Sequence, residues 1–253
     1  MIAFISHADM SIVNDSPESN QQVKMYPFLS FFIHSIQGVL SLFTALASTT
    51  PGAIFLLNHS IFLAVDQCPL LQLNVPFGYP VYPSKLTPTE RRHIRSILKP
   101  LFQLILILVD TVRSFRGVRN EIIQFIQSSI NCSFIILEDR EPDEIQALEV
   151  LALYEGILSM IACDKNSLAE ELNGFEKIIG TKLLEIVKSV QNDKKLCTEI
   201  QQVVIGEKGE HSGSLNKPSK KAVLMKSVVE YSIIYLHHYG ESIPSELLKT
   251  LGY

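Results

Sequence analysis

The sequence predicts an all-α fold, and three observations lead to that prediction. Apolar residues recur at three- and four-residue spacing along most of the chain, which is the period of a helix buried on one side. Many of these segments open with a Ser or Thr cap, a proline at the first helical position, or acidic residues in the first turn. No segment alternates strictly between apolar and polar residues, as a half-buried strand would. We expect the helices to stack as successive antiparallel pairs, in an irregular α-solenoid or a layered helical bundle without a fixed repeat length.

The composition is that of an ordered globular chain with a small net charge. Its 253 residues are enough for one large domain or two small ones, and 47% of them are hydrophobic. The mean hydropathy of +0.21 is high for a soluble protein and raises the question of a membrane segment. The net charge is -4 and the pI is about 6.0, whereas nucleic-acid-binding domains have a basic stripe and a high pI. We therefore expect no direct nucleic-acid partner.

The first part of the chain divides into a polar lead-in and a long uncharged stretch. Residues 1–25 are rich in polar and turn-forming residues and are predicted to be a disordered lead-in without a secretory signal, whereas residues 26–253 are predicted to form the α-helical solenoid segment. From Met25 to Val65 there is no Asp, Glu, Lys or Arg. Within that stretch, residues 28–47 carry apolar side chains at the helical period, which predicts an amphipathic helix with an uncharged outer face. The alternative is a membrane-associated helical protein with residues 28–47 as its anchor.

Prolines mark the elements that follow. Thr50 is predicted to cap a helix that has Pro51 at its first position, and the apolar run after it supplies one or two short helices. Residues 68–86 are predicted to be an extended Pro-rich linker.

A long helix is predicted to begin directly after this linker. Thr87 and Glu90 have the spacing of a capping box, and the helical pattern then continues to about Val112. Pro100 is expected to kink this helix. After Pro100 the helix is apolar on nearly every face, so we expect it to be buried between neighbouring helices on both sides.

The second half of the chain is predicted to consist of helices separated by polar loops. The loop 206–218 is rich in glycine and charge and is predicted to be flexible. A short helix is expected near the last residue. The longer predicted helices cover residues 118–130, 142–162, 167–190, 196–205 and 219–239.

The sequence shows no recognisable motif for catalysis, a cofactor or a metal ion. The seven histidines form no H-E-x-x-H pattern, and there is no nucleophile elbow or phosphate-binding glycine loop. The acidic run 138–144 is expected to be a solvated loop. We therefore expect no enzyme activity, cofactor or metal. An all-α enzyme with an unrecognised site is the alternative, and it would need a pocket that gathers His93 or His237 with carboxylates.

The cysteines are expected to be reduced thiols in a cytosolic or nuclear protein, because no two of them have C-x-x-C spacing. They are Cys68, Cys132, Cys163 and Cys197.

One basic cluster is a candidate binding surface. Arg92, Arg95 and Lys99 are three and four residues apart, which places them on one face of the helix predicted after Thr87. This basic strip has two interpretations: a solvated face that pairs with Glu90 and its neighbours, or a surface that binds a partner.

The order of segments from the Pro-rich linker onward resembles a known protein family. The linker leads into LTPTERRHIRSILKPLFQLILILVDTV, followed by RGVRNEIIQFIQSSI, an acidic spacer, EIQALEVLALYEGILSMIA, SLAEELNGFEKIIGTKLLEIVKSV, a polar loop with KPSKKA, and VLMKSVVEYSIIYL. This order is similar to part of the C-terminal α-solenoid of the large inner-ring scaffold nucleoporins, the vertebrate 205 kDa and fungal 192 kDa class. The matching features are Thr87-Pro88, the basic turn from Arg91 to Arg95, the step from Leu98 to Pro100, Gln124-Phe125-Ile126, and Leu148 to Ser159.

The resemblance covers about residues 28–240 and implies a structural function. Such a protein would belong to the inner ring of the nuclear pore complex in the nuclear envelope, support nucleocytoplasmic transport, and bind the linker segments of adaptor nucleoporins. It would bind no small-molecule substrate and would not span the membrane. The expected mode of recognition is a partner's amphipathic helix that lies in an apolar groove. Members of the family are several times longer, so the chain would correspond to a C-terminal piece, and partner sites outside that piece are not carried over.

Overall fold

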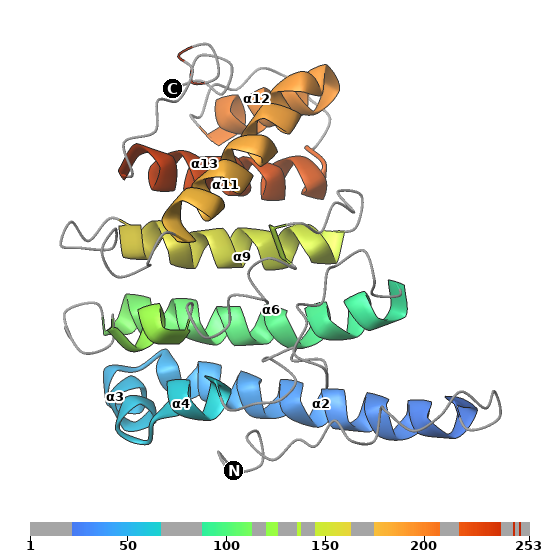
Figure 1. Cartoon of the computed structure of the whole chain (residues 1–253), viewed down its shortest axis with the longest axis vertical. Coiled ribbons are helices and arrows are strands. Elements are labelled where there is room, and N and C mark those ends of the chain that lie inside the picture. Colours follow the sequence, from blue (N-terminus) through green and yellow to red (C-terminus); the bar gives the residue numbers. More distant parts are fainter. Residues whose placement is uncertain are drawn as a thin grey trace. The chain divides into compact units, whose positions relative to one another are not determined.

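The computed structural model describes most of the predicted helices and confirms the all-α prediction. The described residues are 22–66, 88–112, 120–125, 136–137, 145–162, 175–207 and 218–238, together with Ser245 and Leu248. They contain helices and turns but no strand. The chain divides into two compact units, Met1–Ile136 and Leu137–Tyr253, whose helices are coloured by sequence in Figure 1. The linker 68–86, most of the loop 206–218 and the lead-in up to residue 21 lie outside the described residues.

In the first unit, α2 (Gln22–Ala47) is the amphipathic helix that the uncharged stretch predicts. It begins inside the segment expected to be lead-in and ends where predicted. Its buried residues are three or four positions apart, as one apolar face requires. They are Ile33, Ile36, Leu40, Phe43 and Ala47.

A tight corner joins α2 to α3 (Thr50–Asn58). The predicted cap was wrong by one residue, because Thr49 rather than Thr50 is the N-cap. The Thr49 hydroxyl accepts a hydrogen bond from the Gly52 backbone N–H at 3.2 Å and donates to the Leu46 carbonyl at 3.0 Å. This side chain therefore satisfies a backbone group on each side of the corner. A turn at Ser60, whose φ of 54° is left-handed, then leads into α4 (Ile61–Asp66).

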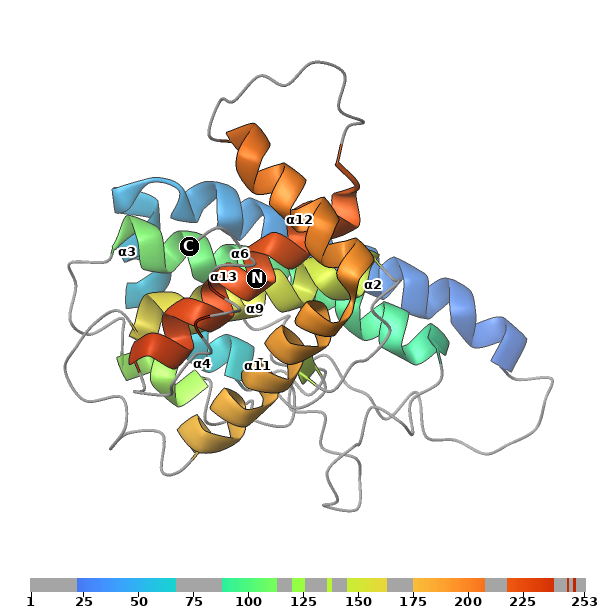
Figure 2. The same cartoon turned by 90° about the horizontal axis from the view of Figure 1, so that it is seen from above.

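The other long helix of the first unit is α6 (Pro88–Thr111), which starts at the predicted proline and continues through Pro100. It packs on α2, and the two helices run in the same direction (Figures 1 and 2). After Pro100 its side chains are buried or half-buried, except for Gln103 and Asp110, which face solvent. The apolar run after Pro100 is therefore mostly core. Of the predicted helix 118–130 the structure describes residues 120–125, where Ile122, Ile123 and Phe125 are buried.

One polar contact between α2 and α6 explains how the helix continues through its proline. Pro100 has no N–H, so the carbonyl of Ser96, four residues earlier, lacks its usual intrahelical donor. The Gln37 side-chain amide of α2 donates a hydrogen bond to this Ser96 carbonyl at 2.8 Å. A neighbouring helix therefore supplies the donor that the proline removes.

The second unit is built around α13 (Lys220–His238), which packs on α9 (Ile145–Ala162), α11 (Phe175–Asn192) and α12 (Lys194–Glu207). Near their starts, α9 and α13 are joined by the ion pair of Glu149 with Lys220, at 2.7 Å. Further along both helices, Ser232 contacts Glu155. The contacts advance together along both sequences, so α9 and α13 run in the same direction. The main pair of each unit is thus parallel and joins helices that are not consecutive, in contrast to the expected successive antiparallel pairs.

The turn between α11 and α12 consists of a single residue, Asp193. Its carboxylate accepts a hydrogen bond from the Leu196 backbone N–H at 3.1 Å and so caps α12. With this cap, α12 begins at Lys194, two residues before the predicted start at Leu196. The helix also ends two residues inside the segment predicted as the flexible loop 206–218, at Glu207.

Candidate functional site

The predicted basic strip lies on α6 but is only partly exposed. Arg92 is exposed, Lys99 is half-buried, and Arg95 is buried with 3% of its surface exposed. All three residues take part in hydrogen bonds, ion pairs, ring contacts or other electrostatic interactions. The three residues share one face of α6, as predicted. Because Arg95 on this face is buried, they do not form a continuous solvent-facing strip. Partner binding through this strip stays a prediction, and Arg92 and Lys99 are the members that a partner could reach.

The first unit exposes large apolar side chains from the uncharged stretch. Leu42 is 47% exposed, Phe55 is 52% exposed and Leu63 is 54% exposed, and Leu46 is also exposed. Leu42 and Leu46 are four residues apart and share one face of α2. We call these four residues the exposed apolar set. The chain has no Asp, Glu, Lys or Arg between Met25 and Val65, so the residues of this stretch form no such ion pair among themselves beside the exposed apolar set.

The hydroxyl groups of α2 reduce the polarity of its outer face further. The hydroxyls of Ser41 and Thr44 donate to backbone carbonyls of α2, each at 2.8 Å, and the hydroxyl of Ser48, directly after the helix, donates to the Ala45 carbonyl at 2.7 Å. A hydroxyl that donates its proton in this way cannot donate to a partner or to solvent, although its oxygen can still accept a hydrogen bond. On α3, the ring of Phe55 stacks against His59, with 4.2 Å between the ring centroids. The outer surface of α2 and α3 is therefore less polar than the residue types suggest.

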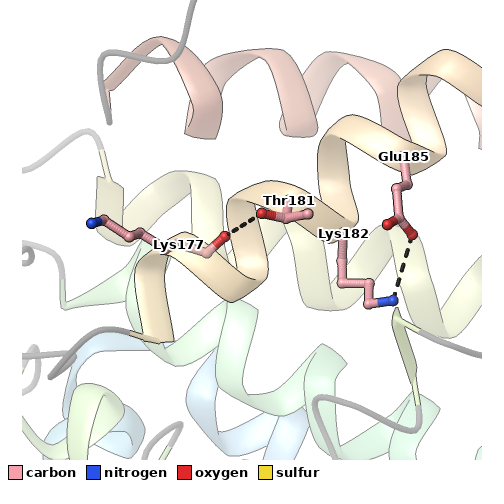
Figure 3. A network of polar contacts seen from close by, with 4 residues as sticks. All are labelled: Lys177, Thr181, Lys182 and Glu185. Atoms are coloured by element: carbon pink, nitrogen blue, oxygen red, sulfur yellow. Dashed lines mark hydrogen bonds and ion pairs between the residues drawn. The ribbon is translucent and has the colours of Figure 1, made fainter.

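The outer face of α11 provides a comparison within the same chain. Lys182 of α11 lies 3.5 Å from the Glu185 carboxylate, and the Thr181 hydroxyl donates to the Lys177 carbonyl at 2.8 Å. Figure 3 draws both contacts as dashed lines. Charged groups on a surface helix remain hydrated and contribute little to stability. This ordinary solvated face differs from the part of α2 after residue 32, where no exposed position carries Asp, Glu, Lys or Arg.

A buried acid lies between α9 and α13 in the second unit. Glu155 is 1% exposed, and its Oε2 accepts a hydrogen bond of 2.6 Å from the hydroxyl of Ser232, which is 0% exposed. Burial raises the pKa of Glu155 well above its ordinary value, while the hydrogen bond from Ser232 lowers it by less. One turn further along α9, the buried Ser159 donates to the Gly156 carbonyl at 2.9 Å. This acid was not among the site residues predicted from the sequence.

A signal for this acid is nevertheless present in the sequence. Glu149 and Glu155 are the two charged residues of α9, and the residues around Glu155 are apolar or small. A charged residue inside such a helix is buried only if its environment neutralises it. Its partner was not predictable, because Ser232 lies 77 residues away in the sequence.

The described residues contain no group of three His, Cys, Asp or Glu side chains arranged to hold a metal ion. His93 lies in α6, in the first unit, and His237 lies at the exposed end of α13, in the second unit. The structure therefore places these two histidines in different units.

Comparison with known proteins adds no family assignment. No protein-family model matches the chain, and no curated protein matches it significantly. Among the helices of the described residues, none has both the length and the apolar character that crossing a bilayer requires.

Proposed function

We propose that the chain is a structural α-helical scaffold segment of the nuclear pore inner ring, and that it binds linker helices of adaptor nucleoporins. The observation that carries this proposal is the exposed apolar set, Leu42, Leu46, Phe55 and Leu63, in a stretch without charged residues. Exposed apolar side chains that lie together commonly mark interaction surfaces, and Leu42 and Leu46 share one face of α2. The proposal assigns no catalytic step to any residue.

The physical basis is the recognition of an amphipathic helix by an apolar surface. Leu42 and Leu46 are one turn apart on α2, a spacing that the apolar face of a partner helix can cover. Fully burying a leucine or phenylalanine contributes about 1.5–3 kcal/mol, so covering the exposed half of each side chain contributes roughly half of that. A highly charged partner would gain no ion pair on this stretch, so the partner surface is expected to be apolar and weakly charged.

The sequence and the fold support this proposal in different ways. The order of segments from Thr87-Pro88 to the helix near residue 239 resembles that of the large scaffold nucleoporins. Parallel packing of helices that are not consecutive is also compatible with a solenoid, in which equivalent helices of neighbouring repeats stack on each other. The helix packing is compatible with a structural role, and the resemblance implies a location in the nuclear envelope.

Imaging of the endogenous protein, tagged at one end, tests this proposal. We expect a punctate nuclear rim that coincides with inner-ring nucleoporins. A reticular or cell-surface membrane signal without those nucleoporins would exclude the scaffold function.

A membrane-associated function is the second candidate, because the same observations suit a lipid surface. From Met25 onward α2 has no Asp, Glu, Lys or Arg, and its Ser41 and Thr44 hydroxyls donate to carbonyls of the same helix. In this case residues 28–47 would lie on the membrane as an interfacial anchor. Flotation of the purified protein with neutral phosphatidylcholine vesicles would favour this candidate, and recovery of all the protein in the unbound fraction would exclude it.

A further inference from the structure

Burying the Glu155 carboxyl group against Ser232 costs free energy, and the proposed scaffold function does not explain this contact. The two side chains come from different helices and are almost completely shielded from solvent. Glu155 Oε2 has its hydrogen bond from Ser232, but Oε1 has no hydrogen-bond partner within the described part of the chain. A buried carboxylate with an unsatisfied oxygen is far more expensive than a neutral carboxyl in the same place.

We propose that Glu155 is a proton-dependent latch, whose carboxyl group is neutral while α9 and α13 are packed together and whose ionisation favours separation of the two helices at this contact. Ser232 has one hydroxyl proton, so it can donate one hydrogen bond to an ionised carboxylate that needs several. The missing donors must come from water, and water reaches Glu155 only when the helices move apart. The latch therefore links the packing of the second unit to proton concentration.

The charged groups of the two helices leave this carboxyl without a close counter-ion. The pairs of Lys220 with Glu149, at 2.7 Å, and of Lys226 with Glu230, at 2.9 Å, join cations of α13 to other carboxylates. Two influences act on the pKa of Glu155, of which burial is the larger and raises it, while the hydrogen bond from Ser232 lowers it. The remaining titratable side chains of α9 and α13 are Tyr154, Lys221, Tyr231, Tyr235, His237 and His238.

The direction of the pH dependence follows from proton linkage. A glutamate in the unfolded chain releases its proton near its ordinary pKa of 4.5, whereas the folded chain keeps the proton to a higher pH. The contribution of Glu155 to stability is therefore complete below pH 4.5 and is lost as the pH rises through the folded-state pKa. Between these two pKa values the unfolding equilibrium constant rises by up to about tenfold per pH unit.

Urea unfolding of the full chain tests the latch. Far-UV circular dichroism monitors the unfolding at a series of pH values from 5 to 8. We expect the unfolding equilibrium constant of the wild type to rise with pH because Glu155 ionises. This part of the pH dependence should disappear in Glu155→Gln, whose side chain has nearly the same shape but cannot ionise. The matched control is Glu185→Gln, which changes an exposed glutamate of α11 and should keep the wild-type pH dependence. The same pH dependence in wild type and Glu155→Gln would overturn the proposal.

Ser232→Ala keeps the proposal testable if Glu155→Gln does not fold. Removing the hydroxyl removes the hydrogen bond that favours the charged form, so the pH range of the stability loss should extend upward. Titration of the Glu155 side-chain carbonyl carbon by nuclear magnetic resonance gives an independent readout. A Glu155 titration near 4.5 in the folded protein, or an unchanged pH range in Ser232→Ala, would contradict the latch.

Discussion

Gly52 lies at the corner between α2 and α3, where no larger residue fits. A Cβ at this position would overlap the carbonyl oxygen of Leu46 and would lie 2.9 Å from the Thr49 hydroxyl. The contacted groups are backbone and a capping side chain that is already fixed by two hydrogen bonds. The corner can therefore accept a side chain only if α2 and α3 move apart.

Gly52→Ala should destabilise the first unit by about 1–3 kcal/mol, because overpacking a fixed site forces the backbone to shift. The matched control is Gly38→Ala in α2, where an added Cβ has no neighbour within 4 Å. This control should stabilise the protein by about 0.5–1 kcal/mol, since alanine favours a helix over glycine. Chemical denaturation of both variants measures the difference. An equal effect of the two substitutions would show that the corner is not tight.

At the scale of elements, the contact of Gln37 with Ser96 can be tested against Pro100. Gln37→Leu removes the donor that serves the Ser96 carbonyl and should cost about 1–2 kcal/mol. In a Pro100→Ala background the N–H of residue 100 returns, so the same Gln37→Leu change should cost less than about 0.5 kcal/mol. Urea denaturation of the wild type, the two single variants and the double variant gives the coupling free energy. A coupling free energy near zero would mean that Gln37 does not compensate for the proline.

The apolar run of α6 makes a second prediction at this scale. Leu104 is completely buried, whereas its neighbour Gln103 is exposed. Leu104→Asp buries an unpaired charge, costs several kcal/mol and should abolish cooperative folding. Gln103→Asp places the same side chain in solvent one position earlier and should change stability by about 0.5 kcal/mol or less. Circular dichroism distinguishes the two variants, and a normally folded Leu104→Asp would show that this face is not core.

The helices themselves were predictable from local chemistry. Pro88 at the start of α6 and the apolar spacing of α2 are properties of neighbouring residues, so the sequence determines them directly. Which of Thr49 and Thr50 caps α3 was not predictable, because both are threonines and the backbone geometry decides between them.

The pairing of helices could not be predicted, because it depends on contacts between distant segments. Periodicity shows that a helix has an apolar face, but not which helix covers it. The parallel pairing of α9 with α13 and the contact of Glu155 with Ser232 are contacts of this kind. The same limit applies to Arg95, since its spacing from Arg92 and Lys99 gives a common face but not which part of that face is buried.

At the scale of the whole molecule, the chain consists of two helical units that differ in the character of their outer residues. The first unit exposes the apolar set from an uncharged stretch. The second unit also exposes Ile178, Val223 and Ile234, but these residues lie on helices that carry charged side chains as well. The first unit is therefore the better candidate for binding a partner helix. The second unit contains the buried acid and is expected to respond to pH.

The most direct test of the scaffold proposal is to identify by mass spectrometry which proteins co-purify with the endogenous protein and with two variants. The double variant Leu42→Ser with Leu46→Ser removes two members of the exposed apolar set, and Ile178→Ser is a matched control at an exposed apolar residue of α11. We predict that the wild type and the control retain inner-ring nucleoporins, whereas the double variant loses them by about tenfold or more, since each leucine contributes on the order of 1 kcal/mol. Absence of nucleoporins from the wild-type sample, or equal recovery with the double variant, would contradict this account.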